Sequence, residues 1–479
     1  MVLSSRPRPD APIDLSAPGH YHVVGAGGPG MSAIALVLAE MGHQVTGTDI
    51  REHPVLDRLR AAGVSVTVGH QRSFVHGVQA VTASSAIPVS NIEIDEALQI
   101  GVPYFVRAGM LASICAQARS VGVAGTHGKT TTTSMLMLIL AAAGMRPNFI
   151  IGGDVTDMGT GAQWTGGEWL VVEADENDRT HLALPLEATI LTNIDADHLE
   201  NYGTFEAIVE GFEQYVAQIP GPKVLCADDR QCARLAGELG PDSGAVTYGT
   251  SPHADYRASG LEATRGVQRF TLSRHGLELG IVDLPLRGVH NVRNATAAVA
   301  MAMELGVEFE VAADAVSRFG GVARRFDFRG EDDGATFIDD YGHIPAEIAA
   351  VLAAARSSGD GWSRVVAVFQ PNRYRRMAIL SPEYRHAFVD ADVTVITDIY
   401  PSGDLPIPGV TGKLVVNAIC DAHPRQRVVW LPRRDDLIGF LAAEVRSGDV
   451  CISMGCGDVA SLPTEVIERR RERARERST

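Results

Sequence analysis

A lysine and a run of threonines follow a short glycine loop, GTHGKTTTT, at residues 125–133. The apolar run before the loop reads as a strand, and the strongly apolar stretch after it reads as a helix. Backbone N–H groups at such a turn can surround phosphate oxygens, whose charge the lysine neutralises. The loop is a shortened form of the usual pattern, because Val123 stands where that pattern has glycine. The residues predicted to bind a nucleotide are Gly125, Thr126, His127, Gly128, Lys129, Thr130 and Thr131.

Acidic residues at two strand ends could complete a magnesium site beside this loop. Glu173 ends the apolar run of GEWLVVEADEND, and His198 stands among the acids of ATILTNIDADHLENYG. A strand-end carboxylate near a phosphate loop commonly holds a metal ion or its water, and a threonine hydroxyl can also bind Mg²⁺. Thr130 and Glu173 are therefore candidate ligands, and His198 could serve a second magnesium ion or the substrate.

A second glycine turn lies near the start of the chain, in YHVVGAGGPGMSAIALVLAEMGHQVTGTD. Gly25, Gly27 and Gly30 have the spacing of turns at which a diphosphate meets the start of a helix. Asp49 ends the next predicted strand and could bond a ribose. NAD and a UDP-sugar both carry a diphosphate and a ribose, so the turn fits either ligand. The polar residues at further predicted strand ends, which would face the same crevice, are His70, Ser84 and Ser85.

Charged residues also cluster after predicted strands in the last third of the chain. Arg325, in the junction GGVARRF, could reach transferring phosphoryl oxygens once the domains close. Arg373 and Arg376, in FQPNRYRRM, suit a carboxylate or phosphate, because a guanidinium group binds either through two hydrogen bonds. The turn in TFIDDYGHIPAE adds Asp340, Tyr341 and His343. Polar strand ends on one sheet edge predict a shared crevice for a second substrate.

The segments between these motifs predict the elements that position them. Short apolar runs alternate with helical stretches, which favours parallel α/β layers. The 479 residues are too many for one core. We expect a Rossmann-like N-terminal domain, a central P-loop ATPase domain and a Rossmann-like C-terminal domain. The predicted boundaries are a flexible start at 1–19, domains at 20–120, 121–323 and 324–467, and a charged tail at 468–479.

The composition excludes several classes of protein. The formal charge of −16 disfavours general nucleic-acid binding, which needs a positive surface. No apolar run reaches the roughly 18 residues of a membrane span. Because the start of the chain also has no apolar signal core, we expect a cytoplasmic protein without membrane insertion. The six cysteines form no CxxC pair, so a zinc site is not expected.

Nine ordered motifs resemble those of the Mur ligases, the ATP-dependent amide-forming enzymes of peptidoglycan precursor synthesis. The motifs are GAGGPGMS, GTHGKTTTT, EADEND, TNIDADHLENYG, HNVRNA, GVARRFD, DDYGHIPAE, FQPNRY and DIYPSGDLPIPGV. The glycine turn and YPSGDLPIPG are most similar to the alanine-adding members of the family. The resemblance implies UDP-N-acetylmuramate and L-alanine as substrates, with ATP and Mg²⁺ as cofactors. We expect a monomer or a homodimer.

The resemblance also implies roles for individual residues. The UDP-sugar would contact Gly25, Gly27, Gly28, Gly30, Met31, Ser32, Asp49, His70, Ser84 and Ser85. ATP would contact the phosphate loop together with Asn291, Asn294, Arg325 and Asp340. Magnesium would be bound by Thr130, Glu173 and His198. The amino acid would contact Tyr341, His343, Arg373 and Arg376. The catalytic residues would be Lys129, His198, Arg325 and His343.

The implied reaction is phosphorylation of the lactyl carboxylate by ATP, followed by attack of the L-alanine amine on the acyl phosphate. Either His343 or His198 could accept the proton of the ammonium group. Three residues depart from the family pattern near the expected amino-acid site: Ile344 and Asn372 each replace a histidine, and Arg375 replaces a threonine. A diverged Mur ligase with another amino acid, peptide or acceptor is therefore an alternative. Two further alternatives are an NAD-dependent dehydrogenase, which would use the first glycine turn but leave GTHGKT unexplained, and a non-catalytic nucleotide-binding protein, which would bind ATP without releasing phosphate.

Overall fold

The computed structural model describes residues 12–84, 86–156, 158–197 and 199–478. Two residues of the predicted sites, Ser85 and His198, lie outside these described residues, as does most of the predicted flexible start. The chain forms two compact units. The first comprises residues 1–259, 271–282 and 293–320, and the second comprises residues 260–270, 283–292 and 321–479.

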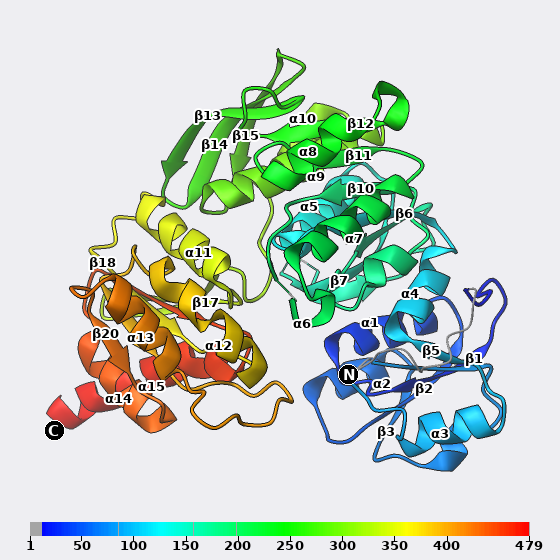
Figure 1. Ribbon diagram of the computed structural model, residues 1–479, viewed down its shortest axis with the longest axis horizontal. Helices are drawn as coiled ribbons and strands as arrows, with labels where there is room; N and C mark the ends of the chain where they lie inside the picture. Colours follow the sequence, from blue (N-terminus) through cyan, green and yellow to red (C-terminus); the bar gives the residue numbers. More distant parts are fainter. Residues whose placement is uncertain (1–11, 85, 157, 198, 479) are drawn as a thin grey trace. The chain divides into compact units, whose positions relative to one another are not determined.

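The first sheet carries the glycine turn and has the strand order β3-β2-β1-β4-β5 (Figure 1). All neighbouring strands run parallel, so their carboxyl ends share one edge, and the order reverses beside β1 as in Rossmann-like sheets. The strands are β1 (His20–Val24), β2 (Gln44–Asp49), β3 (Ser65–Val68), β4 (Ala80–Ala83) and β5 (Tyr104–Val106). The helices are α1 (Pro29–Glu40), α2 (Pro54–Ala61), α3 (Ile92–Gln99) and α4 (Arg107–Cys115).

The second sheet carries the phosphate loop and has the order β15-β14-β13-β12-β11-β10-β6-β9-β7-β8. Strand β6 runs parallel to both β9 and β10, so the loop after β6 lies between the ends of those strands. The strands are β6 (Arg119–Ala124), β7 (Asn148–Val155), β8 (Thr160–Gln163), β9 (Trp169–Glu173), β10 (Ala188–Leu191), β11 (Lys223–Cys226), β12 (Ala245–Gly249), β13 (Tyr256–Thr264), β14 (Val267–Arg274) and β15 (Leu277–Leu284). The helices are α5 (Lys129–Ala142), α6 (Leu199–Tyr202), α7 (Phe205–Ala217), α8 (Arg230–Glu238), α9 (Val289–Glu304) and α10 (Phe309–Ser317).

The third sheet has the order β16-β17-β21-β18-β19-β20, with β16 antiparallel at one edge and the other neighbours parallel. Val365 and Ala367 belong to one core cluster, and Val366 and Val368 to another. Side chains alternate along a strand, so both sheet faces are buried. The strands are β16 (Asp327–Asp332), β17 (Ala335–Asp340), β18 (Arg364–Phe369), β19 (Val393–Ile396), β20 (Val428–Trp430) and β21 (Asp449–Met454). The helices are α11 (Pro345–Ser357), α12 (Tyr374–Leu380), α13 (Lys413–Ala422), α14 (Arg434–Glu444) and α15 (Leu462–Ser478).

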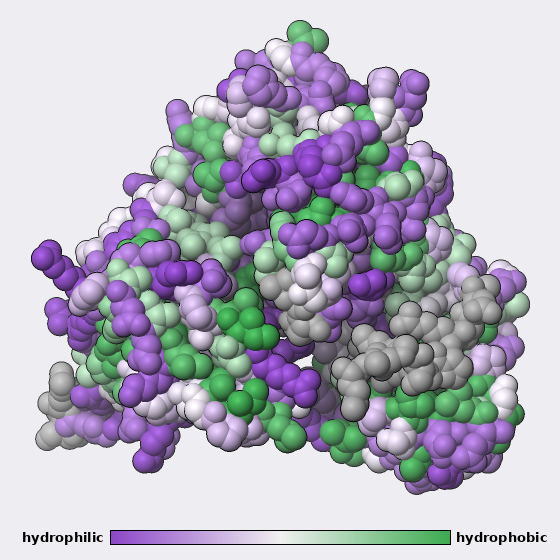
Figure 2. Space-filling view, in the orientation of Figure 1, coloured by the Kyte–Doolittle hydropathy of each residue, from purple (hydrophilic) through white to green (hydrophobic). Residues whose placement is uncertain are grey.

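These sheets confirm the predicted α/β class, whereas the exact domain boundaries stay a prediction. Helix α15 runs through the predicted charged tail as far as Ser478. Arg470 anchors this helix, because its Nε donates to Asp332 Oδ2 at 2.7 Å. Among the described residues no helix is long and apolar enough to cross a membrane. Hydrophilic residues cover much of the face in Figure 2, with hydrophobic ones interspersed.

Candidate active site

Two glycines shape the phosphate loop between β6 and α5. Gly125 and Gly128 have φ angles of +120° and +82°, in the region that residues with a Cβ rarely adopt. A Cβ on Gly125 would lie 2.2 Å from Thr192 Oγ1 and 2.9 Å from the backbone N and O of Asn193. A Cβ on Gly128 would lie 2.5 Å from Asn294 Oδ1. Both positions therefore require glycine for conformation and for space.

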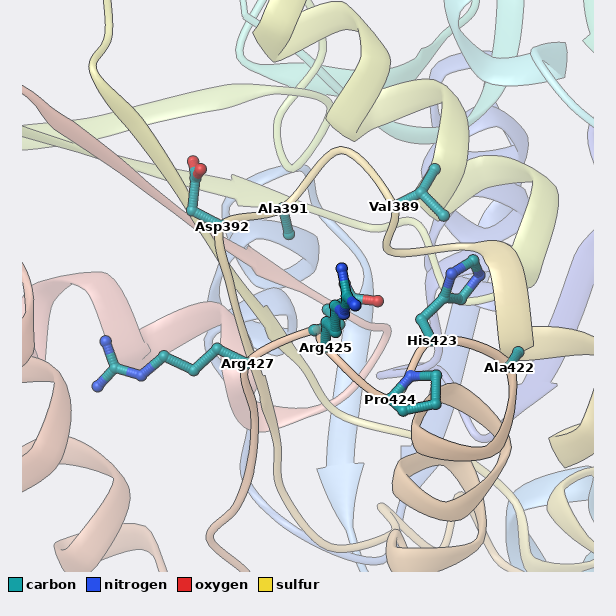
Figure 3. Close-up of a pocket in the computed structure, with 9 residues that line it drawn as sticks. Val389, Ala391, Asp392, Ala422, His423, Pro424, Arg425 and Arg427 are labelled. Carbon is teal, nitrogen blue, oxygen red and sulfur yellow. The ribbon is translucent and has the colours of Figure 1, made fainter.

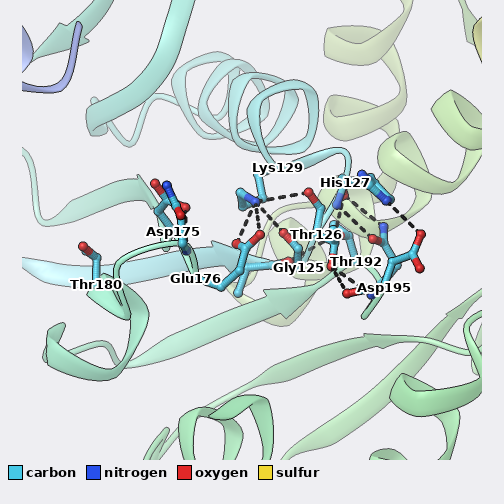
Figure 4. Close-up of polar contacts among 12 residues, drawn as sticks. Gly125, Thr126, His127, Lys129, Asp175, Glu176, Thr180, Thr192 and Asp195 are labelled. Carbon is cyan, nitrogen blue, oxygen red and sulfur yellow. Dashed lines mark hydrogen bonds and ion pairs between the residues drawn. The ribbon is translucent and has the colours of Figure 1, made fainter. Parts of the chain in front are cut away.

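The segment that follows β10 holds this loop in place (Figure 4). The His127 N–H donates to Asn193 Oδ1 at 2.8 Å, and Asn193 Nδ2 donates back to the His127 carbonyl at 3.0 Å. Thr192 Oγ1 donates to the same carbonyl at 2.6 Å. The N–H of Thr126 donates to the Asn193 carbonyl at 3.0 Å. Phosphate oxygens would therefore be met by the first turn of α5, whose N–H groups have no partner within the helix.

Lys129 begins α5 and turns back over the loop (Figure 4). Its Nζ donates to the carbonyls of Gly125 at 2.6 Å and Thr126 at 3.3 Å, and to Glu176 Oε2 at 2.8 Å. Burial lowers the pKa of Lys129, but the charges of Glu176 and Asp175 outweigh this effect, so the pKa is raised overall. Lys129 therefore carries a positive charge inside the loop at neutral pH.

The predicted magnesium ligands Thr130 and Glu173 come from neighbouring elements. Thr130 lies in the first turn of α5 and is buried. Glu173 ends β9, in register with Val123 of β6, and its Oε1 accepts the N–H of Gly152 at 2.7 Å. Because Val123 is two residues before Gly125, this register places Glu173 beside the strand that leads into the loop.

These two oxygen donors fit Mg²⁺. The ion usually takes one or two protein oxygens and completes its shell with phosphate oxygens and water. Across the described ranges no group of three or more His, Cys, Asp or Glu side chains could hold a metal ion. A magnesium ion here would therefore depend on the nucleotide for further ligands.

The two asparagines of α9 predicted to contact ATP lie in different surroundings. Asn294 is the side chain that a Cβ on Gly128 would meet, so it borders the phosphate loop. Asn291 lies one turn earlier, and its Nδ2 donates to the Arg287 carbonyl at 2.8 Å. The structure places Asn294 beside the phosphate loop, whereas contacts of both asparagines with ATP stay predictions.

The glycine turn after β1 leads into α1 as predicted. Asp49 Oδ2 accepts the N–H of Gly27 at 2.8 Å, so the residue predicted to bond a ribose also supports the turn. Gly28 caps α1, and Met31 in its first turn is 1% exposed. The Met31 side chain therefore belongs to the core, and its predicted ligand contact would have to use the backbone. Ser32 Oγ donates to the Pro29 carbonyl at 2.9 Å.

His70 follows β3 and belongs to a buried polar network. Its Nδ1 lies 2.9 Å from Glu93 Oε2 and 3.2 Å from Thr48 Oγ1. Burial acts to raise the pKa of Glu93, but hydrogen bonds involving His22, Thr48 and Gln71 outweigh it, so the pKa is lowered overall. The charged Glu93 therefore fixes the ring of His70 at the carboxyl edge of the sheet. Ser84 was predicted, like His70, to face the UDP-sugar. Its Oγ accepts the N–H of Ala86 at 3.2 Å.

In the second unit, the junction arginines have different surroundings. Arg324 and Phe326 have φ angles of +63° and +50°, so two strained left-handed residues flank Arg325. Arg324 Nε donates to Asp339 Oδ2 at 2.9 Å, and Asp339 is fully buried. The guanidinium group of Arg325 lies 5.1 Å from the ring centroid of Tyr341. Arg324 lies over the same ring, also at 5.1 Å, so both arginines contact Tyr341, and Arg324 is in addition fixed to the sheet by an ion pair.

Asp340 connects this junction to the polar turn after β17. Its two carboxylate oxygens accept the N–H groups of Gly342 at 2.7 Å and Phe326 at 2.8 Å. Burial raises the pKa of Asp340 to about 6, although Arg325 and these N–H groups act in the opposite direction. In the same turn, His343 Nδ1 lies 3.2 Å from the Tyr341 carbonyl and 3.3 Å from Glu347 Oε2.

The predicted amino-acid arginines lie close to a cysteine that the sequence had not singled out. Burial raises the pKa of the Cys456 thiol, while the charges of Arg376, Arg324 and Arg373 act in the opposite direction. Arg373 has φ +60°, and its N–H donates to the Tyr400 carbonyl at 2.9 Å. Arg376 is 5% exposed. Arg324 Nη2 donates to the Gly455 carbonyl at 2.6 Å, which places Arg324 at the end of β21, and a role of Arg373 and Arg376 in binding the amino acid stays a prediction.

A groove of about 620 Å³ lies elsewhere on the third sheet (Figure 3). Asp392 and Arg427, which line it, directly precede β19 and β20. The groove is therefore at the amino ends of these strands, whereas the predicted amino-acid residues lie at carboxyl ends. It is separate from the predicted site.

Family models match nearly the whole chain. They are the Mur ligase family catalytic domain at residues 20–119, the Mur ligase middle domain at 123–302 and the Mur ligase glutamate ligase domain at 324–457. The chain belongs to the Mur ligase family. A UDP-N-acetylmuramate--L-alanine ligase of Rubrobacter xylanophilus is 43% identical over 450 residues, covering 94% of this Mur ligase and 99% of the relative. One from Bradyrhizobium sp. (strain BTAi1) is 42% identical over 460 residues, covering 94% and 98%.

Solved structures show the same fold. A UDP-N-acetylmuramate-alanine ligase from Thermotoga maritima aligns with a TM-score of 0.79 and 27% identity, covering 95% of this Mur ligase and all of that chain. A murein peptide ligase from Psychrobacter arcticus aligns with a TM-score of 0.67 and 26% identity, covering 94% and 98%. The resemblance drawn from the nine motifs is therefore confirmed, as is the three-domain α/β fold with a central ATP-binding domain.

Sequence reasoning missed several residues of this Mur ligase site. Thr192 and Asn193 hold the phosphate loop, and Glu176 bonds Lys129. Arg107 contacts the acidic segment after β9. A usable signal existed for Arg107, because it directly follows the strand Tyr104–Val106, where the same strand-end rule had selected other residues.

Proposed function

We propose that this protein is an ATP-dependent ligase that joins L-alanine to the lactyl carboxylate of UDP-N-acetylmuramate in peptidoglycan precursor synthesis. The main support is a Mur ligase phosphate loop that holds a charged Lys129, in a chain 42% identical to a protein named as that ligase. We expect the protein to work in the cytoplasm as a monomer or a homodimer.

The lactyl carboxylate takes the γ-phosphoryl group of ATP and becomes an acyl phosphate, because phosphate leaves an acyl carbon more readily than hydroxide does. The amine of L-alanine then attacks this carbon, and the tetrahedral intermediate collapses to an amide and phosphate. Lys129 stabilises the charge of the transferring phosphoryl oxygens through Nζ. Magnesium bound by Thr130 and Glu173 would supply further neutralisation of that charge.

We assign the proton acceptor for the ammonium group to His343. Its Nδ1 lies 3.3 Å from Glu347 Oε2, and a carboxylate at that distance stabilises the imidazolium that forms. The Nδ1 proton is directed to the Tyr341 carbonyl, at 3.2 Å, so Nε2 is the nitrogen that accepts. Arg373 and Arg376 would bind the carboxylate of the amino acid, since guanidinium groups can bind carboxylates through two hydrogen bonds.

The same chemistry with another amine is a second candidate. Ile344, Asn372 and Arg375 replace the usual residues in the segments that carry the predicted amino-acid site. The chain also resembles a murein peptide ligase, at 26% identity. A free amino acid and the amine of a peptide would undergo the same attack on an acyl phosphate, so only the pocket would differ.

Phosphate release from ATP tests both candidates. The assay compares reactions with and without UDP-N-acetylmuramate across L-alanine, glycine, L-serine and a peptide that begins with L-alanine. Release that needs the sugar nucleotide and L-alanine together supports the proposal, and release with another amine favours the second candidate. Absence of release with every amine would refute ligation, and a change in nicotinamide absorbance on adding NAD with candidate substrates would instead indicate a dehydrogenase.

A further inference from the structure

One short segment of the first unit lies between the two predicted anion sites. This acidic loop, Asp175–Thr180, follows β9. On one side, Glu176 accepts two hydrogen bonds from Lys129 Nζ, at 2.8 and 3.1 Å (Figure 4). The Glu176 side chain is 3% exposed, and the Glu176 carbonyl accepts the hydroxyl of Tyr202 at 2.8 Å. The loop is therefore tied to the lysine of the phosphate loop.

Arg107 holds the other side of the acidic loop. Its Nη2 lies 3.1 Å from Asp175 Oδ2, 3.3 Å from both oxygens of Asp178 and 3.4 Å from Thr180 Oγ1. The remainder of the same side chain borders the glycine turn. A Cβ on Gly30 would lie 3.1 Å from Arg107 Cδ, 3.5 Å from Nη1 and 3.9 Å from Nε. One guanidinium group thus bonds the acidic loop and adjoins the turn predicted to hold the UDP diphosphate.

Hydrogen bonds within the acidic loop hold its two ends in a fixed arrangement, so a change at one end can affect the other. Asp175 Oδ1 accepts the N–H of Asn177 at 3.1 Å, and Asp178 Oδ1 accepts the N–H of Thr180 at 3.2 Å. Asn201 Nδ2 donates to the Asn177 carbonyl at 3.0 Å. The side chains that meet Arg107 are therefore fixed relative to the backbone that carries Glu176.

We propose that Arg107 and Glu176 are positioning residues that couple the two sites, so that binding of the sugar nucleotide tightens binding of ATP and the reverse. The inference rests on the proposed function, because it takes the glycine turn as the diphosphate site. A diphosphate at the turn would accept hydrogen bonds from Nε and Nη1 of Arg107, while Nη2 stays bonded to the acidic loop. Ordering the guanidinium group would then also order Glu176 and Lys129. The ligand that binds second would lose less conformational entropy, because the first ligand has already ordered these side chains.

The experiment measures the dissociation constant of a non-hydrolysable ATP analogue with Mg²⁺, with and without saturating UDP-N-acetylmuramate. Allosteric coupling typically changes affinity about 5- to 150-fold, so we expect at least a 5-fold tightening in the wild-type protein. Arg107→Lys keeps the charge but cannot form both sets of hydrogen bonds. For this variant we expect the ratio of the dissociation constant without UDP-N-acetylmuramate to that with it to fall to near 1. Its affinity for the analogue alone should stay within about 3-fold of wild type.

Further variants separate coupling from folding. Asp178→Asn alters the acidic loop without touching the glycine turn, so its ratio should also fall, and it replaces Arg107→Lys if that variant does not fold. Glu176→Gln should also lower the ratio, because it weakens the contact between the acidic loop and Lys129. Arg119→Lys is the matched control, because Arg119 also pairs with two carboxylates, Glu168 and Glu187, and should keep the wild-type ratio.

The outcomes distinguish this inference from the proposed function. A wild-type ratio near 1, or a wild-type ratio retained in both Arg107→Lys and Asp178→Asn, would overturn the coupling even if the enzyme makes product. A ratio above 5 that is lost in the variants would support the coupling even if no amide forms with L-alanine. If Arg107 had a purely structural role, Arg107→Lys would lower the melting temperature and weaken binding of the ATP analogue both with and without UDP-N-acetylmuramate. The ratio of the two dissociation constants would then be unchanged.

Discussion

Replacing Gly125 by alanine tests how tightly the phosphate loop is built. Gly125 has φ +120°, and an added Cβ would lie 2.2 Å from Thr192 Oγ1. A residue with a Cβ pays about 1–2 kcal/mol for the left-handed backbone. Thr192 would also have to move, although its hydroxyl donates to the carbonyls of Ala124 and His127 at 3.1 and 2.6 Å. The hydroxyl has a single proton, which the two carbonyls share, so losing this hydrogen bond costs about 1 kcal/mol. The total is then about 2–3 kcal/mol.

Gly144→Ala is the matched control for this prediction. Gly144 lies beyond α5 at φ +76°, and an added Cβ there would have no atom within 4 Å. This variant carries the backbone cost but no clash, so the two variants should differ by about 1 kcal/mol. If the loop relieves the clash by moving, Gly125→Ala should bind the ATP analogue about 5-fold more weakly than Gly144→Ala.

Equilibrium binding of the ATP analogue, with melting temperatures measured in parallel, provides the readout. The clash should also lower the melting temperature of Gly125→Ala by about 2–4 °C more than that of Gly144→Ala. Equal affinities and equal melting temperatures for the two variants would show that the contacts of Thr192 do not fix the loop, and the reasoning would be wrong.

Three further predictions concern charges. Lys129→Ala should slow phosphate release about 10²- to 10³-fold, while Lys223→Ala, whose Nζ bonds only local carbonyls, should stay near wild type; equal rates would refute the role of Lys129. Glu173→Gln should raise the Mg²⁺ concentration needed for half-maximal activity about 10-fold or more, whereas the exposed Glu168→Gln should not. Because the pKa of Asp340 is raised to about 6, the folded state binds its proton more tightly than the unfolded state, so this group's contribution to stability falls as pH rises from about 4 to 6. Between about pH 4 and 6, the free energy of unfolding should fall less, or rise more, for Asp340→Asn than for the wild type in denaturant unfolding, and parallel curves would contradict this.

The phosphate loop and the sheets could be predicted because local sequence determines them. The run from Val121 to Ala124 is apolar and β-rich, the glycines follow at once, and the next 14 residues form α5. A short segment with one strong preference needs no distant partner to be recognised. The same holds for the turn after β1, where Pro29 at the start of α1 marks the boundary.

The remainder of the site depends on contacts between distant residues, which periodicity does not encode. Arg107 meets Asp175 from 68 positions away, and Thr192 reaches the His127 carbonyl from 65 positions away. The left-handed backbone of Arg324 and Phe326 was also unpredictable, since neither is a residue type that favours positive φ.

The grouping of residues 260–270 with the second unit shows the same limit. These residues belong to β13, β14 and the turn between them and fall within the predicted central domain, but Gly266 donates its N–H to the Ser358 carbonyl at 3.2 Å. A Cβ on Gly359 would lie 3.1 Å from the Ala263 carbonyl oxygen. Such packing of a hairpin tip on a distant loop leaves no pattern in the sequence.

The bonds of Arg107 also bear on how freely this chain could exchange modules with its relatives. The N-terminal sheet meets the central one through charged pairs that must match: Arg107 with Asp175 and Asp178, and Arg58 with Asp154 at 2.8 Å. A chimera that imported the first 120 residues from a homologue without arginines at positions 58 and 107 would leave the acids of the central domain, Asp154, Asp175 and Asp178, without these guanidinium partners. Functional chimeras of such enzymes should therefore be those in which the arginines and their acidic partners come from the same parent.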